Sequence, residues 1–328
     1  MVAGAERVGT EPAGILEELL ADVEGPRVVA VGGGHGLAAA LGGIRGYAGR
    51  VDAVVTVADD GGSSGRLAPA LDIPPPGDIR QCLVALTPDE SVWRQLFEYR
   101  FAGADVMGHS MGNLILAALA DIEGSFDRAL ASAERLLGSV GSVIPAAPEH
   151  LRLEATIGGA TVRGQVAISL ARGPVEAIRV LPREAKATPR AVEAIESADQ
   201  IVLGPGSLYT SIMAALVVPG ITEAINRSSG QLVYVVNLTT QDGETLGMDA
   251  ADHLDALIRL TGVRPPAAIV APKEPVDAAP PLEPVRVDGD VLATYGVDLV
   301  TADLVDRRSS RPVHDPDALG VVLGSIVE

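Results

Sequence analysis

The chain has 328 residues, of which 47% are hydrophobic, 21% charged and 3% aromatic. This composition predicts one or two folded domains with an aliphatic core, and it excludes a disordered or fibrous chain. The formal net charge of −18 argues against a nucleic-acid partner, because such partners are held by Lys and Arg that neutralise phosphates. A small phosphorylated ligand, which needs one or two local cations, remains compatible with this charge.

Several other protein classes are also excluded by the sequence. No uninterrupted apolar run approaches the roughly 18 residues of a membrane span, and the acidic first 25 residues do not resemble an export signal. We therefore expect a cytoplasmic protein. Neither Lys186 nor Lys273 lies in a P-loop motif, which excludes a P-loop hydrolase. Cys82 lies in an apolar run and is interpreted as a buried, unreactive thiol.

In chain order, the sequence begins with a predicted short helix at 14–23 and then alternates strands with helices. The apolar run 27–31 ends in the glycine turn 32–36, an Ala- and Leu-rich helix follows, and a second apolar run covers 51–57. This order is typical of a βαβ unit with a parallel sheet buried on both faces. After the break at 74–78, helical periodicity predicts helices at 79–86, 91–99, 113–120 and 126–137.

The middle of the chain has a different pattern. Residues 151–157 and 161–170 alternate apolar and polar side chains across Gly158 and Gly159, which predicts an antiparallel hairpin. The hairpin is either an appended β segment or an antiparallel edge of the main sheet. Later strands are predicted at 200–203, 232–236, 267–270 and 298–301, with helices after 207, at 250–260 and at 317–327 and a Pro-rich loop at 271–284.

These elements predict an α/β fold with a Rossmann-like, mostly parallel sheet flanked by helices. We expect an N-terminal extension at 1–25 and a single domain at 26–328, with the hairpin insertion at about 146–185.

Three glycine-rich turns, at 32–36, 61–65 and 204–207, each follow a predicted parallel strand. Such turns gather at the carboxyl ends of the strands, where α/β sheets bind ligands. Their backbone N–H groups and the following helix favour a phosphate. The first turn lacks the dinucleotide fingerprint, because Leu37 stands where the third glycine belongs.

Charged residues accompany the turns. Asp59 and Asp60 end the second strand, where carboxylates can accept ribose hydroxyls, hold Mg²⁺ against phosphates, or simply cap a turn. Asp78 is either an N-cap or a functional group. Arg66 and Arg80 are cations that could fork onto a phosphate, although each alone is more typical of a surface arginine.

Residues 108–112 match the G-x-S-x-G elbow of serine hydrolases, with Ser110 as the nucleophile. The elbow requires a buried strand before the serine, and residues 101–107 make a poor one. The competing interpretation, which we favour, is that Ser110 caps a helix that carries Asn113 on its first turn. The sequence contains no Cys/His cluster, so we do not expect a zinc site.

Six segments together resemble the YvcK-type gluconeogenesis factors (UPF0052), which lie beside the 2-phospho-L-lactate transferase (CofD) enzymes in one superfamily. The segments are 28–37, ADDGGSSGRL at 58–67, PGDIRQCL at 76–83, GHSMGNL at 108–114, GPGSLYTS at 204–211 and NLTTQDGET at 237–245. The sequence departs from the pattern at His35, where many relatives have Thr, and at Met111, where Leu is usual.

The resemblance implies a Rossmann-like, often dimeric protein that binds UDP-sugars, especially UDP-N-acetylglucosamine, and acts in cell shape and envelope synthesis during growth on gluconeogenic carbon. The alternative that it implies is a Mg²⁺-dependent phospho-ester transferase with Asp59, Asp60 and Asp78 as candidate catalytic residues and Asp59 and Asp60 as metal ligands. The expected ligand-binding residues are Gly33, Gly34, His35, Gly36, Asp59, Asp60, Gly61, Gly62, Ser63, Ser64, Arg66, Asp78, Arg80, Asn113, Gly204, Gly206, Ser207 and Asn237.

Overall fold

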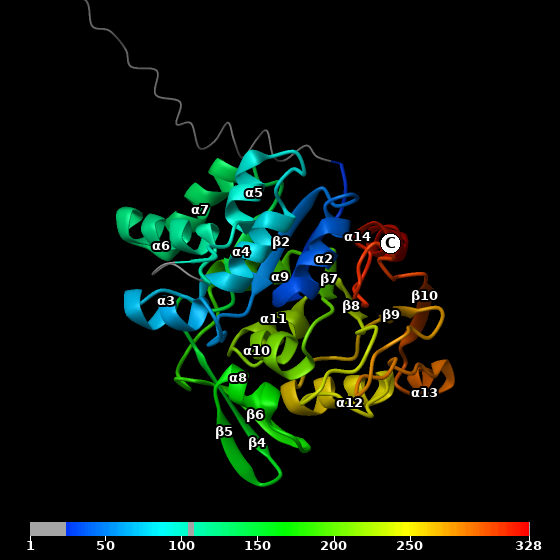
Figure 1. Cartoon of the computed structure of the whole chain (residues 1–328). Helices are drawn as coiled ribbons and strands as arrows, with labels where there is room; N and C mark the ends of the chain where they lie inside the picture. The colour runs from blue at the N-terminus through cyan, green and yellow to red at the C-terminus, as the bar shows by residue number, and fades with distance from the viewer. Residues whose placement is uncertain (1–23, 104–107, 328) are drawn as a thin grey trace, which may run out of the picture.

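The computed structural model describes residues 24–103 and 108–327, so the helix predicted at 14–23 lies outside the described residues. Its centre is a seven-stranded parallel sheet in the order β10-β9-β8-β7-β1-β2-β3 (Figure 1). The strands between the two edges of the sheet are nearly continuous apolar runs whose side chains are buried on both faces, as a parallel sheet requires, whereas the edge strand that ends the order at β10 is partly exposed. They are β1 (Arg27–Gly32), β2 (Arg50–Val55), β3 (Ser142–Pro145), β7 (Gln200–Leu203), β8 (Gln231–Val235), β9 (Ala268–Pro272) and β10 (Asp298–Ala302).

The strand order changes direction at β1, and this positions the site. β1 pairs with β2 on one side and with β7 on the other, both in parallel. After β1 the chain adds β2 and β3 on one side of that strand. It later adds β7, β8, β9 and β10 on the other side. The carboxyl ends of β1 and β7 therefore meet at a topological switch point, the usual ligand position in such sheets.

Helices flank the sheet, as predicted. Because parallel crossovers are right-handed, building in opposite directions from β1 places helices on both faces. On one side α2 packs against α4 and α14, whereas α9 packs against α11. The helices are α2 (Gly34–Ile44), α3 (Ser64–Leu71), α4 (Pro76–Ala85), α5 (Val92–Glu98), α6 (Met111–Glu123), α7 (Phe126–Leu137), α9 (Pro189–Glu196), α10 (Ala214–Leu216), α11 (Ile221–Arg227), α12 (Ala250–Thr261), α13 (Gly289–Thr294) and α14 (Pro316–Ile326).

The hairpin belongs to a separate three-stranded antiparallel sheet in the order β5-β4-β6, not to an edge of the main sheet. The sheet consists of β4 (Arg152–Ile157), β5 (Ala160–Arg163) and the unpredicted β6 (Val175–Leu181). The prediction of strand over 161–170 is wrong beyond residue 163, because Gln165–Leu170 forms the short helix α8. At the centre of this sheet the Glu154 carboxylate pairs with Arg163 and Arg179 on the flanking strands, and these arginines hold its pKa below the usual range.

The segment that follows β7 is a π-helix, η2 (Leu208–Met213), rather than an ordinary α-helix. All six of its residues are buried. Within the described ranges no single helix is long and apolar enough to cross a membrane. One sharply bent pair, Leu208–Leu216 with Ile221–Arg227, meets the length and composition criteria only when the two are joined. Cys82 is free and buried, as predicted.

Candidate functional site

The first and third glycine turns touch at the switch point. Gly36, in the first turn of α2, lies so close to the β7 turn that a Cβ atom there would be 2.1 Å from the Pro205 carbonyl oxygen. A Cβ atom on Gly206 would be 3.4 Å from the Gly33 carbonyl oxygen. Glycine is needed here because backbone approaches backbone, and the two turns together form one surface at the sheet edge.

Asn237, the second residue after β8, fixes the third turn. Its Oδ1 accepts from the Gly206 N–H at 2.8 Å, and its Nδ2 donates to the Gly206 carbonyl at 2.7 Å. With both amide atoms bonded to Gly206, Asn237 is a positioning residue for this turn. Glu244, which the sequence did not single out, acts beside it by accepting from the Tyr209 N–H and the Thr210 hydroxyl at the start of η2.

Asp78 lies against the first turn. It is in the first turn of α4, whose N-cap is Pro75, so Asp78 is not itself the N-cap. A Cβ atom on Gly33 would be 2.5 Å from Asp78 Oδ2. Burial and the negative charge of Asp59 raise the pKa of Asp78 to about 7. A hydrogen bond from the Gly34 N–H stabilises the carboxylate and has the opposite, smaller effect on this pKa. A carboxyl group that titrates near neutral pH at a sheet edge is typical of a functional site.

The two neighbouring aspartates have different surroundings. Asp59 Oδ1 accepts from the Gly61 N–H at 3.0 Å, and its Oδ2 would lie 3.2 Å from a Cβ atom on Gly77, beside Asp78. Asp60 points away, toward α8, where its two carboxylate oxygens accept from the Gln165 and Val166 N–H groups at 3.0 Å each. Asp59 is therefore the member of the pair that faces Asp78, whereas Asp60 holds the insertion against the second turn.

Ser63, Ser64 and Asn113 come together behind this edge. Ser63 Oγ lies 2.8 Å from His109 Nδ1 and accepts from Asn113 Nδ2 at 2.9 Å. Ser64 Oγ accepts from the Gly77 N–H at 3.0 Å. Asn113 is buried, and its Oδ1 has no hydrogen-bond partner among the described residues. This edge thus collects polar groups from the second turn, α4 and α6.

Ser110 is the N-cap of α6, as favoured from the sequence. Its side chain is completely buried and accepts from the Asn113 N–H at 3.3 Å. Ser110 pairs with Arg100 in an isolated β-bridge. Among the described residues directly before Ser110 there is no buried strand of the kind that an elbow needs. The structure therefore does not support a hydrolase with Ser110 as its nucleophile.

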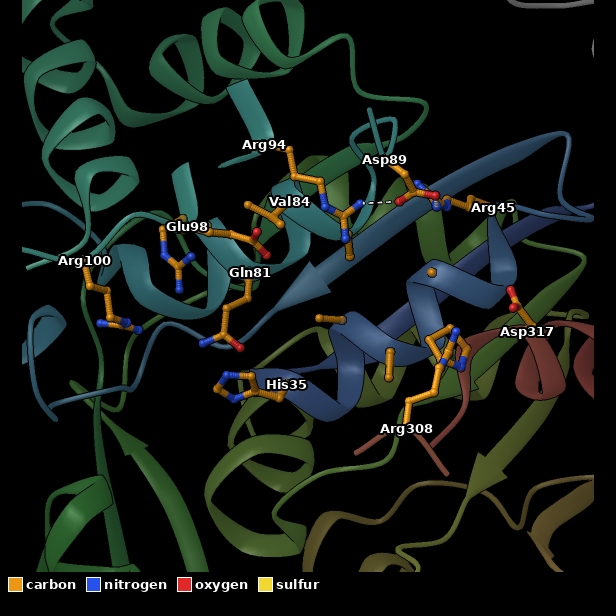
Figure 2. A pocket seen from close by; sticks show the side chains of 16 residues that line it. His35, Arg45, Gln81, Val84, Asp89, Arg94, Glu98, Arg100, Arg308 and Asp317 are labelled. Carbon is orange, nitrogen blue, oxygen red and sulfur yellow. Dashed lines mark hydrogen bonds and ion pairs between the residues drawn. The ribbon is translucent and has the colours of Figure 1, made fainter. Parts of the chain in front are cut away.

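The two predicted cationic residues, Arg66 and Arg80, lie in different places near the carboxyl edge of the sheet. Arg66, on α3, has an Nη2 atom 3.3 Å from where a Cβ atom on Gly108 would be. Arg80 is buried in α4 and, with His35, lines a groove of about 640 Å³ between α2 and α4 (Figure 2). Of the predicted site residues, His35 and Arg80 line this groove. Sequence reasoning missed Arg100, another of its arginines, because nothing in the sequence near residue 100 marks a ligand site.

His150 is a further residue that the sequence did not identify. It follows β3, its Nε2 is buried without a partner among the described residues, and the charges of Asp59 and Asp60 act on its pKa. Burial is the larger effect and lowers that pKa. A histidine is too common for its type alone to mark it; only the fold brings it near the two aspartates.

Mg²⁺ is the cofactor whose fit can be examined. The described residues contain no group of three or more His, Cys, Asp or Glu side chains that could hold a metal ion. Asp59 and Asp78 nevertheless lie close enough to interact, and the charge of Asp59 adds to burial in raising the pKa of Asp78. Mg²⁺ commonly uses one or two carboxylates together with water and substrate phosphates, so this pair fits a substrate-dependent Mg²⁺ better than a resident metal centre.

Comparison with known proteins gives consistent matches over almost the whole chain. The family model described as 2-phospho-L-lactate transferase CofD matches residues 28–305. The gluconeogenesis factor of Halalkalibacterium halodurans is 42% identical over 283 residues, covering 84% of this chain and 88% of that protein. The gluconeogenesis factor of Bacillus subtilis is 36% identical over 312 residues, covering 92% of this chain and 98% of that protein.

A solved structure agrees with these matches. The crystal structure of a UPF0052 family member from Bacillus halodurans superimposes with a TM-score of 0.86 at 39% identity, covering 92% of this chain and 99% of that one. The agreement of family model, curated relatives and fold shows that the chain belongs to the CofD family and, within it, to the group of proteins named gluconeogenesis factors.

Proposed function

We propose that this protein is a regulatory protein that binds a nucleotide sugar, UDP-N-acetylglucosamine in particular, at the carboxyl edge of the sheet. The diphosphate lies on the first and third glycine turns, and the ribose hydroxyls bond to Asp59. In the cell the protein supports cell shape and envelope synthesis during growth on gluconeogenic carbon, and it acts in the cytoplasm.

The observation that carries this proposal is the contact between the two turns at the switch point. Gly36 and Gly206 can approach Pro205 and Gly33 only because they lack side chains, and the resulting surface offers backbone N–H groups beside the start of α2. Such surfaces bind phosphate groups in α/β sheets. Asp59, next to the same edge, supplies an acceptor for hydroxyl groups.

The direct test is calorimetric titration with UDP-N-acetylglucosamine. Wild-type protein should bind, and Asp59→Asn should bind about tenfold or more weakly, because a charge-assisted hydrogen bond to a ribose hydroxyl is lost. Asp242→Asn, on the exposed surface where Asp242 pairs with Arg172, is the matched control and should bind like wild type. Absence of binding to wild-type protein, or equal binding by Asp59→Asn, would refute this site.

A second candidate function, a Mg²⁺-dependent phospho-ester transferase, is favoured by the match to the CofD family and by the Asp59–Asp78 pair. Mg²⁺ would neutralise charge on the transferred phosphoryl group when it is bound. Product formation from UDP-sugar or lactyl-phosphoryl donors with Mg²⁺, and its loss in EDTA and in Asp78→Asn, would support the transferase. Tight binding without turnover over a broad panel of acceptors would support the regulator.

We further propose that the protein is a homodimer. Val92, Trp93 and Tyr99, on and beside α5, are 75%, 44% and 55% exposed, and a cluster of large exposed apolar side chains marks an interaction surface. Sedimentation equilibrium should give twice the chain mass, and Trp93→Asp should shift the protein toward the monomer. A wild-type protein that sediments as a monomer would contradict the dimer.

A further inference from the structure

The groove between α2 and α4 has an apolar floor and a charged rim. Its floor is formed by small side chains on the facing sides of the two helices, namely Ala38, Ala39, Gly42, Val84 and Ala85. The volume of about 640 Å³ is ample for a small-molecule ligand. Figure 2 shows arginine side chains around the groove, together with His35, which belongs to the first glycine turn.

The rim is basic although the protein as a whole is strongly acidic. It carries five arginines and three carboxylates, whereas the whole chain has a net charge of −18. The arginines are Arg45, Arg80, Arg94, Arg100 and Arg308, and the carboxylates are Asp89, Glu98 and Asp317. A local excess of positive charge that runs against the sign of the protein indicates a site for an anion.

The arginines at the far end of the groove already have partners. Arg45 and Arg94 both pair with Asp89, each at 2.7 Å. Arg308 pairs with Asp306 at 2.8 Å and lies 3.7 Å from Asp315. These three side chains are therefore largely neutralised within the protein and define the wall of the groove.

Arg80 and Arg100 differ from them. Neither makes an ion pair with any residue that the structure describes. Arg80 is only 5% exposed, its Nε has no hydrogen-bond partner among the described residues, and its Nη1 reaches the Phe97 carbonyl at a long 3.4 Å. A buried guanidinium with an unpaired N–H is costly unless an acceptor arrives from outside.

The surroundings of Arg80 do not supply that acceptor. Burial and the positive charge of Arg100 lower the pKa of Arg80. The negative charges of Glu98 and Asp78 raise this pKa, but their effect is smaller. Partial burial and the same two arginines lower the pKa of His35. The lowered pKa favours a neutral His35, which offers a ring N–H donor next to two guanidinium groups that have no ion-pair partner among the described residues.

We propose that this groove, which shares His35 with the first glycine turn and extends away from that turn between α2 and α4, is a second binding site for a small phosphate monoester. Its phosphate binds between Arg80, Arg100 and His35, and its organic part lies on the floor formed by Ala38, Ala39 and Gly42. A phosphate fits better than a carboxylate, because it offers enough oxygens and charge for two arginines and an imidazole at once. The site does not require that the protein bind a nucleotide sugar.

The test uses glycerol 3-phosphate and inorganic phosphate as probes, with glycerol as the neutral control, in calorimetric titrations of the full-length protein. We expect both phosphates to bind and glycerol not to bind. Arg100→Gln should weaken binding by about tenfold or more. Because Arg100 is exposed, this variant should fold like wild type. Arg172→Gln, an equal charge change at an exposed arginine paired with Asp242, is the matched control and should bind like wild type.

A second variant and a competition experiment separate this site from the proposed nucleotide site. Arg80→Lys keeps the charge but loses the guanidinium fork, so it should also weaken phosphate binding while the protein unfolds at a temperature near that of wild type. UDP-N-acetylglucosamine and glycerol 3-phosphate should bind simultaneously. The inference is overturned if neither phosphate binds, if Arg100→Gln binds like wild type, or if UDP-N-acetylglucosamine displaces the monoester. If phosphate binds as expected and the nucleotide sugar does not, the proposed function fails and this site stands.

Discussion

Ser63 Oγ and His109 Nδ1 lie 2.8 Å apart, although 46 positions separate the two residues in the chain. Asn113 Nδ2 donates to the same oxygen, which leaves the Ser63 hydroxyl one proton and one further lone pair for its contact with the imidazole. Burial and the charge of Arg66 lower the pKa of His109 and so favour the neutral ring. The histidine of the G-H-S-M-G segment thus serves Ser63, in the second glycine turn, and not its neighbour Ser110.

Ser110 should accordingly behave as a structural residue. We expect Ser110→Ala to lower the free energy of unfolding by about 0.5–2 kcal/mol, because the N-cap bond to the Asn113 N–H is lost. A fluorophosphonate probe should not label Ser110 in the wild-type protein. Urea unfolding and mass spectrometry of the probe-treated protein test the two statements, and covalent label on Ser110 would restore the hydrolase.

Asp78 should make the stability of the protein depend on pH. Its pKa is about 7 in the folded protein against an ordinary value of 3.8, so the folded state holds a proton that the unfolded chain releases. Stability contributed by this group is therefore lost as the pH rises from about 4 through 7. Asp78→Asn cannot ionise and keeps an acceptor for the Gly34 N–H. Its stability relative to wild type should be about 2 kcal/mol greater at pH 8 than at pH 5.

Urea titrations of both proteins at these two pH values give the comparison. A difference between variant and wild type that is the same at pH 5 and pH 8 would show that Asp78 ionises normally. Because the Asp78 carboxyl group lies at the proposed site, Asp78→Asn should also change the affinity for UDP-N-acetylglucosamine. Comparing the change in affinity with the change in stability shows whether this residue trades stability for function.

Gly36 should not tolerate a side chain. Alanine is normally better than glycine inside a helix, yet here its Cβ atom would lie 2.1 Å from the Pro205 carbonyl oxygen. We expect Gly36→Ala to lower the free energy of unfolding by about 1–3 kcal/mol, because backbone must move to relieve the overlap. It should also weaken nucleotide-sugar binding by separating the two turns. Gly103→Ala, whose added atom would have no atom of the described residues within 4 Å, is the control, and equal stability of the two variants would refute the contact.

Asn237 should matter through both atoms of its amide. Asn237→Ala loses the bonds to the Gly206 N–H and carbonyl, and we expect a loss of about 2 kcal/mol in the free energy of unfolding. Asn237→Asp keeps an acceptor for the N–H but places a negative charge beside the carbonyl, so it should rescue little. Thermal unfolding of the three proteins is sufficient, and an Asp variant as stable as wild type would show that the donor bond contributes nothing.

The parallel sheet was predictable because its strands are nearly unbroken apolar runs bounded by glycine turns. The central strands β1, β2, β7 and β8 follow directly from this pattern. β3 was missed because it has four residues and ends in proline, which leaves almost no pattern to detect. The error at α8 has a physical reason as well. Every second residue of Gln165–Leu170 is a large apolar one, and a segment of six residues is too short to distinguish this spacing from that of a short helix.

The site was predictable in parts but not in its contacts. Glycine turns after parallel strands indicated the edge, and topology alone brings 32–36 beside 204–207. Which aspartate faces which group depends on tertiary packing: Asp59 and Asp60 are equivalent in the sequence, yet only Asp60 caps α8. Arg100 and His150 carry no local signal and become visible only when the chain is folded.

A crystal structure of the protein with UDP-N-acetylglucosamine bound tests the central claim most directly. The proposal predicts the diphosphate against the turns 32–36 and 204–207 and the ribose within hydrogen-bond distance of Asp59. The groove of Arg80 and Arg100 should remain free of the nucleotide. A ligand that contacts neither glycine turn would contradict the account, even though the family of the protein would be unchanged.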